Sequence, residues 1–62
     1  MTMTSKEIIK LLEQNGFVCV RQNGSHKFYI NKETNRMTTV PMHHKDLPKG
    51  TEQKILKDAG LK

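Results

Sequence analysis

The sequence is poor in cysteine and in long apolar runs, and each scarcity excludes a class of protein. A single cysteine, Cys19, cannot form an internal disulfide. No apolar run approaches the length of a transmembrane helix, and no secretory signal peptide is recognisable. One thiol without a signal peptide predicts a cytoplasmic protein that does not associate with membranes.

The chain has 62 residues, which predicts a single domain over residues 1–62 with an ordered core at about residues 4–61. So short a chain buries only a thin core, and it folds marginally unless a disulfide, a metal or a partner chain supports it. The isolated domain is therefore expected to have low stability.

The charge balance is basic. The chain has 11 lysines and arginines against 6 acidic residues, a net charge of +5 at pH 7. Such an excess in a small domain suits a polyanion such as RNA or DNA, or an acidic protein. Three basic residues and no acidic one lie between Arg21 and Lys32. A soluble basic surface without a ligand would have the same composition.

Two segments have the apolar spacing and the end signals of helices. The first, "TSKEIIKLLEQNGF", begins with a candidate N-cap and capping box at Thr4 and ends at Gly16. The second, "TEQKILKDAGLK", ends at Gly60. Its start has two candidate N-caps, Asp46 before an early turn or Thr51.

Three segments between the helices are predicted to be strands: "FVCVR", "HKFYI" and "MTTV". The turns "QNGS" and "NKETNR" separate them, and Pro41 is expected to end the third. Alternation along the second strand predicts that Phe28 and Ile30 face the core and that Tyr29 faces away from it. Cys19, between two valines, is expected to be a small core residue.

The predicted fold class is α+β, with the order α-β-β-β-α in one small domain. Short hairpins join the strands into a three-stranded antiparallel sheet. Each helix has one apolar stripe to bury, so both helices are expected on one face of the sheet. Double-stranded-RNA-binding domains share this order of elements.

His26 follows the Gly24-Ser25 turn at a position where neither the turn nor the strand requires a histidine. A neutral imidazole can accept the proton of an RNA 2′-hydroxyl as that oxygen attacks the adjacent phosphorus. Lys27, Arg21 and the backbone N–H groups of the turn are candidates, by position, to stabilise the charge on the phosphate. This chemistry needs no metal or other cofactor, and it would spare DNA. An ordinary turn histidine has the same pattern, so the residues alone leave both interpretations open.

Other polar residues also have a functional and a structural interpretation. Tyr29 is a candidate to stack on a base or to pack across strands, and Lys45 joins Arg21 and Lys27 as a candidate phosphate contact. A zinc site from Cys19 and the three histidines fits no common finger spacing, so no metal site is predicted.

Four short segments of the chain occur in a recognisable order: "GF" at Gly16-Phe17, "RQNGSHKFY" at Arg21–Tyr29, "TVPMHHKDLPKGT" at Thr39–Thr51 and "ILKDAGL" at Ile55–Leu61. Together they resemble the HicA family of bacterial toxins, and the similarity runs from about Ser5 to Leu61. The resemblance implies a fold like that of double-stranded-RNA-binding domains. It also implies a metal-independent mRNA interferase of a type II toxin–antitoxin system, which arrests translation and growth.

The resemblance also implies site residues and a partner. His26 falls on the histidine of the family's Gly-Ser/Thr-His motif, so it is expected to be the catalytic general base. His43 falls on the histidine of the family's Val-Pro-x-His segment, where a second proton donor, an RNA contact and a structural hydrogen bond are all open. A HicB-type antitoxin is expected to mask the active site. The alternatives are an RNA-binding module without catalysis and an interaction protein whose basic surface meets an acidic chain.

Overall fold

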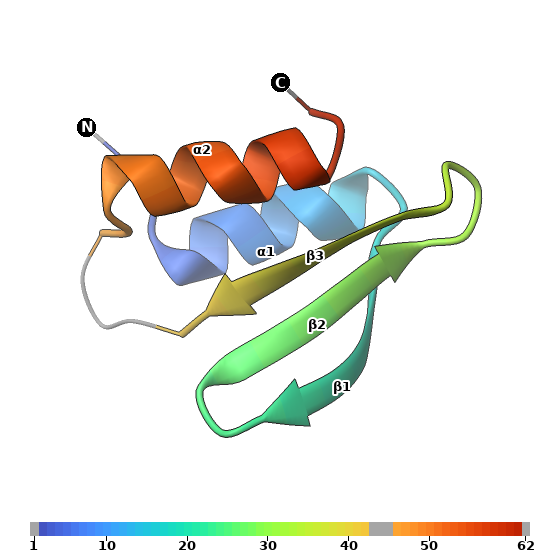
Figure 1. Ribbon diagram of the computed structural model, residues 1–62, viewed down its shortest axis with the longest axis horizontal. Coiled ribbons are helices and arrows are strands. Elements are labelled where there is room, and N and C mark those ends of the chain that lie inside the picture. Colours follow the sequence, from blue (N-terminus) through green and yellow to red (C-terminus); the bar gives the residue numbers. More distant parts are fainter. Residues whose placement is uncertain (1, 43–45, 62) are drawn as a thin grey trace.

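The helices and strands follow the predicted order along the chain (Figure 1). The structure, a computed structural model, describes residues 2–42 and 46–61. The elements are α1 (Ser5–Gln14), β1 (Val18–Asn23), β2 (His26–Asn31), β3 (Arg36–Pro41) and α2 (Lys49–Asp58).

The three strands form an antiparallel sheet in the order β1-β2-β3, so β1 and β3 are its edges. Both helices lie side by side on one face, nearest to β3 (Figure 1). The predicted α+β class and helix placement are therefore confirmed. The core between the helices and the sheet consists of Ile8, Leu12, Phe17, Tyr29, Val40, Leu47, Ile55 and Ala59.

Helix α1 begins and ends where its sequence signals predict. The Thr4 hydroxyl accepts a hydrogen bond from the Glu7 N–H at 3.2 Å, and the Glu7 carboxylate accepts one from the Thr4 N–H at 2.8 Å. At the other end Gly16 has a φ of 91°, and the Phe17 N–H donates to the Leu12 carbonyl at 3.0 Å. This left-handed end turns the chain towards the sheet and brings Phe17 into the core.

Helix α2 begins between the two predicted starts. Its first residue is Lys49 and its N-cap is Pro48, which has no capping side chain. Asp46 and Thr51 were the expected caps, and both predictions are wrong. Proline at a helix entry loses nothing by lacking an N–H, because that group would have no partner within the helix. The predicted end at Gly60 is confirmed by its φ of 75°.

The predicted faces of β2 are wrong. Tyr29 is 2% exposed and belongs to the core, whereas Phe28 and Ile30 are only half-buried. Tyr29 pairs with Thr38, which is buried, and the neighbouring Val40 of β3 is also buried. Both alternating sets of this strand contain an aromatic residue, so alternation of hydrophobicity could not choose the face that meets the helices.

Strand β1 lies at the edge of the sheet farthest from α2 (Figure 1), and all six of its residues are exposed. Cys19 was expected in the core, but it is exposed because the helices pack over β3 rather than β1. The pairing with β2 shifts register between Cys19 and Arg21, so Val20 forms a β-bulge.

Two truncations test the extent of the core. Leu12→Ala removes a fully buried side chain and is expected to lower the free energy of unfolding by about 2–5 kcal/mol. Val18→Ala removes methyl groups from a side chain that is 52% exposed, so its effect should stay within about 0.5 kcal/mol. Urea unfolding followed by circular dichroism measures both. Equal losses would contradict this boundary of the core.

Candidate functional site

His26 is the first residue of β2 and follows a tight turn. Gly24 has a φ of 62°, as the first central residue of a type II′ hairpin turn requires, and Asn23 pairs with His26 across the turn. The Ser25 carbonyl accepts a hydrogen bond from the Met42 N–H at 2.6 Å. The turn that carries the histidine is therefore tied to the chain that leaves β3.

The His26 side chain lies on the sheet face that the helices leave open. His26 lies two and four residues before Phe28 and Ile30, so the three side chains point to the same face of the sheet. The buried Tyr29 points to the opposite face. His26 is exposed. No hydrogen bond to its ring comes from residues 2–42 or 46–61. Both ring nitrogens are thus available to a ligand, so far as the described residues are concerned.

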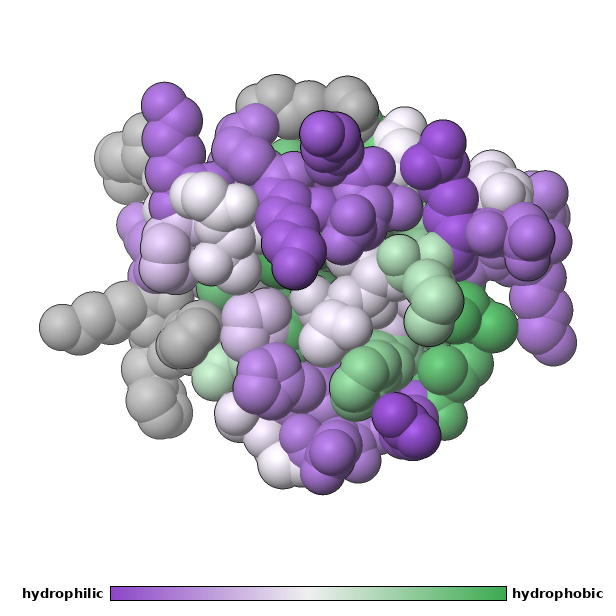
Figure 2. All heavy atoms as spheres, viewed as in Figure 1, coloured by the Kyte–Doolittle hydropathy of each residue, from purple (hydrophilic) through white to green (hydrophobic). Residues whose placement is uncertain are grey.

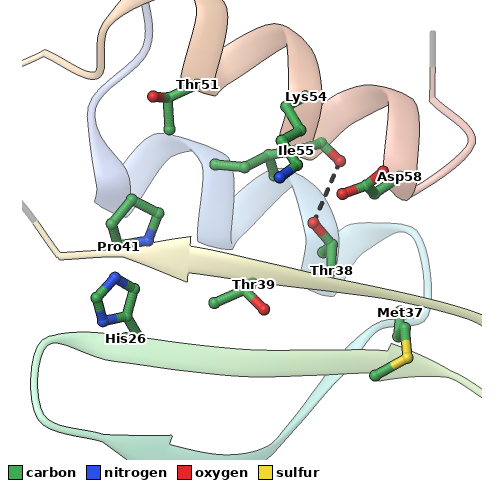
Figure 3. Close-up of a pocket in the computed structure, with 9 residues that line it drawn as sticks. All are labelled: His26, Met37, Thr38, Thr39, Pro41, Thr51, Lys54, Ile55 and Asp58. Atoms are coloured by element: carbon green, nitrogen blue, oxygen red, sulfur yellow. Dashed lines mark hydrogen bonds between the residues drawn. The ribbon is translucent and has the colours of Figure 1, made fainter.

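A groove of about 520 Å³ lies between β3 and α2, and His26 lies at one end of it (Figure 3). The imidazole is beside Pro41, and the helix contributes the opposite wall. The Thr38 hydroxyl donates to the Ile55 carbonyl at 3.4 Å and joins the two walls. The lining residues are His26, Met37, Thr38, Thr39, Pro41, Thr51, Lys54, Ile55 and Asp58.

The two basic residues predicted beside His26 do not line this groove. The Arg21 guanidinium lies 4.7 Å from the centroid of the Phe28 ring, on the open face of the sheet. Lys27 pairs with Val40, so it lies on the helix side and is half-buried. The structure therefore places Arg21 on the same sheet face as His26 and Lys27 on the opposite face, and neither cation lines the groove.

Tyr29 cannot stack on a base, because it is buried under the helices. The prediction that it faces away from them is corrected by the pairing of β2 with β3. Burial raises the pKa of Tyr29 above its ordinary value. The neighbouring Cys19 and Glu13 raise this pKa further, because a negative charge on either disfavours the phenolate.

Three predicted or considered positions, His43, His44 and Lys45, lie outside the described residues. Within residues 2–42 and 46–61, no three histidine, cysteine or acidic side chains are placed to share a metal ion. In the same part of the chain, no helix is long and apolar enough to cross a membrane.

The sequence interpretation missed the contribution of α2 to the groove. Thr51, Lys54 and Asp58 lie on one side of the helix together with the buried Ile55, at the spacing i, i+3, i+4 and i+7. This spacing was available in the sequence. Solvated helix charges have the same pattern, so it indicates a site only once the position of β3 is known.

One comparison with known proteins identifies a family. The model of the family described as the HicA toxin of bacterial toxin–antitoxin systems matches residues 5–61, almost the whole chain. No curated protein sequence gives a significant match.

The raised pKa of Tyr29 predicts a pH dependence of stability. The folded chain holds the phenol proton more tightly than the unfolded chain, whose tyrosine has the ordinary pKa of 10.0. The contribution of Tyr29 to stability is therefore complete below pH 10.0 and is lost as the pH rises through the higher folded value.

Ultraviolet absorption of tyrosinate measures this shift directly, because Tyr29 is the only tyrosine and the chain has no tryptophan. The folded protein should titrate above pH 10.0 and the protein in urea near that value. Tyr29→Phe should remove the signal and is the control for other absorbing groups. Identical midpoints in the two solvents would contradict the burial of this phenol.

Proposed function

The chain belongs to the HicA toxin family of bacterial toxin–antitoxin systems, and from this premise we propose that it is a metal-independent mRNA interferase with His26 as its general base. Cleavage of mRNA would arrest translation and growth. The observation that carries the proposal is the exposed imidazole of His26 at the end of a groove, with no hydrogen-bond partner among the described residues.

The proposed reaction uses one acid–base group of the protein and a nucleophile of the substrate. The neutral His26 imidazole accepts the proton of the 2′-hydroxyl as that oxygen bonds to the adjacent phosphorus. The bond from phosphorus to the 5′-oxygen breaks, the leaving oxygen takes a proton from a water molecule, and the imidazolium returns its proton to the solvent. The products are a 2′,3′-cyclic phosphate and a 5′-hydroxyl. Positioned general-base catalysis contributes about 10²–10⁴ in rate.

The turn before His26 has space for a phosphate. A Cβ placed on Gly24 would meet no atom within 4 Å, so this part of the turn is open. The N–H groups of Gly24 and Ser25 are our candidates for donors to the phosphate oxygens. Arg21 and Lys27 remain candidates for phosphates farther along the strand, since neither lines the groove.

The alternative function is an RNA-binding module without catalysis. It would use the same basic surface, and RNA affinity would fall with salt because phosphate contacts release counterions. A protein that meets only an acidic chain would bind no RNA. The three functions therefore differ in whether RNA is bound and in whether products appear.

The nuclease proposal predicts cleavage of single-stranded RNA in EDTA and a rate about 10²–10⁴ lower for His26→Ala. Because this side chain is exposed, the substitution should change the free energy of unfolding by less than about 0.5 kcal/mol. A DNA oligonucleotide of the same sequence should remain intact. Gel electrophoresis of labelled oligonucleotides measures the rate.

His44→Ala is the matched control, because no sequence motif assigns a role to His44, and it should cleave at the wild-type rate. Cleavage by His26→Ala at that rate would refute the proposed base. RNA binding without products in the wild-type protein would instead select the non-catalytic module.

We also propose that the antitoxin docks on the open face of the sheet and covers His26 there. In Figure 2, hydrophobic residues gather over one end of the strands, at the right of the view, whereas hydrophilic residues cover the helices and the hairpin end of the sheet. Val18, Val20 and Met37 are 52%, 52% and 64% exposed, and Val18 and Met37 flank the half-buried Ile30 on its two neighbouring strands. An apolar patch of this kind in a small basic domain is typical of a protein interface.

The charge of this face favours an acidic partner. Arg21 lies on it over Phe28, and the chain carries a net charge of +5 at pH 7. An acidic antitoxin surface would be attracted by this charge. Its binding would bury the apolar residues of the sheet face between the two proteins. His26 shares the face, so the same partner would exclude RNA from the imidazole.

Met37→Asp is expected to weaken the complex with the antitoxin encoded beside the toxin gene by at least tenfold, because it buries a charge without a partner. Thr34→Asp adds the same charge to an exposed loop and should leave the affinity unchanged within about twofold. Calorimetry measures both. Equal affinities for the two variants would place the antitoxin on another surface.

A further inference from the structure

We propose that the groove between β3 and α2 holds the ribose-phosphate of a single RNA strand, with the Lys54 ammonium group as a phosphate contact. The inference rests on the proposed function, since the same RNA would present its 2′-hydroxyl to His26. It adds a residue from α2, a helix that neither the turn motif nor the predicted phosphate contacts include.

Helix α2 is anchored so that one row of polar side chains overhangs the edge strand. Ile55 is 3% exposed, and its carbonyl accepts a hydrogen bond from the buried Thr38 hydroxyl of β3. Lys54 precedes it on the helix, is exposed and extends into the groove (Figure 3). The fixed backbone of α2 therefore positions the flexible Lys54 side chain above β3. This strand ends at Pro41, which pairs with His26.

The lining has the composition of a ligand site. Met37, Pro41 and Ile55 supply apolar surface, and a few polar groups converge on it. Thr39 and Thr51 lie on opposite walls, and a threonine hydroxyl that rotates into the groove can hydrogen-bond a sugar or a phosphate oxygen. The groove's volume, about 520 Å³, lies in the range of small-ligand sites.

Lys54 and Asp58 make the electrostatic potential differ between the two ends of the groove. Asp58 lies at the end away from His26, and Lys54 lies between the two (Figure 3). A phosphate is attracted to the ammonium group and repelled by the carboxylate, so it is held towards the His26 end. This is the end at which the proposed reaction requires a phosphorus atom. The carboxylate can accept a hydrogen bond from the ribose or the base of the adjoining nucleotide.

The other lysines of α2 provide a contrast. Lys57 does not line this groove, although it follows Lys54 by one helical turn. It lines a separate surface hollow together with Gly50, Gln53 and Lys54. Lys54 and Lys57 thus carry the same charge on the same helix, but only Lys54 lines the groove that leads to His26.

Binding of an RNA oligonucleotide with 2′-O-methyl groups tests the groove without cleavage, because that RNA has no free nucleophile. Fluorescence anisotropy over a salt series gives the affinity and its salt dependence. Lys54→Gln is expected to lower the magnitude of the slope of log K against log salt by about 0.7, the value for one phosphate contact on a single strand. Asp58→Asn should tighten binding, since it removes a repulsive charge.

Lys57→Gln is the matched control and should leave the slope nearly unchanged, and Lys54→Arg should retain it because the charge is kept. Equal losses of slope in Lys54→Gln and Lys57→Gln, or no loss in either, would overturn the inference. The readout does not depend on catalysis. A slope change for Lys54→Gln with full cleavage by His26→Ala would uphold the groove and reject the proposed base.

Discussion

The register of β2 against β3 is the constraint on which both the core and the candidate site depend. Tyr29 pairs with Thr38 and is the largest of the fully buried side chains. Complete burial of a large apolar side chain contributes about 1.5–3 kcal/mol, a large share of the stability of so small a domain. A slip of one residue would expose this ring and turn His26 under the helices. The packing of the phenol ring therefore decides where the imidazole lies.

This dependence explains which parts of the fold were predictable from the sequence. The capping box at Thr4 and the left-handed residue Gly16, with a φ value of 91°, depend on neighbours a few positions away. Such local signals can be found in one sequence. The faces of Tyr29 and Cys19 depend on where two helices lie across the sheet. No pattern within their strands contains that information.

The candidate site divides in the same way. His26 and its turn occupy consecutive positions, so a short motif was enough to single them out. The wall formed by Thr51, Lys54 and Asp58 comes from a helix more than twenty residues farther along the chain. A lysine on a helix surface carries no sign of what faces it. The contact between Ile55 and Thr38, and the groove that both elements line, show that this row overhangs β3.

The bulge at Val20 has a consequence for how copies of the chain behave towards one another. An edge strand such as β1 presents main-chain donors and acceptors to which a strand of another molecule can add. The extra residue interrupts this row between Cys19 and Arg21, so an incoming strand cannot keep continuous register along it. Arg21 adds a repulsive charge between identical edges. At the β1 edge, this interruption therefore disfavours strand pairing between identical copies when no other chain covers the strand.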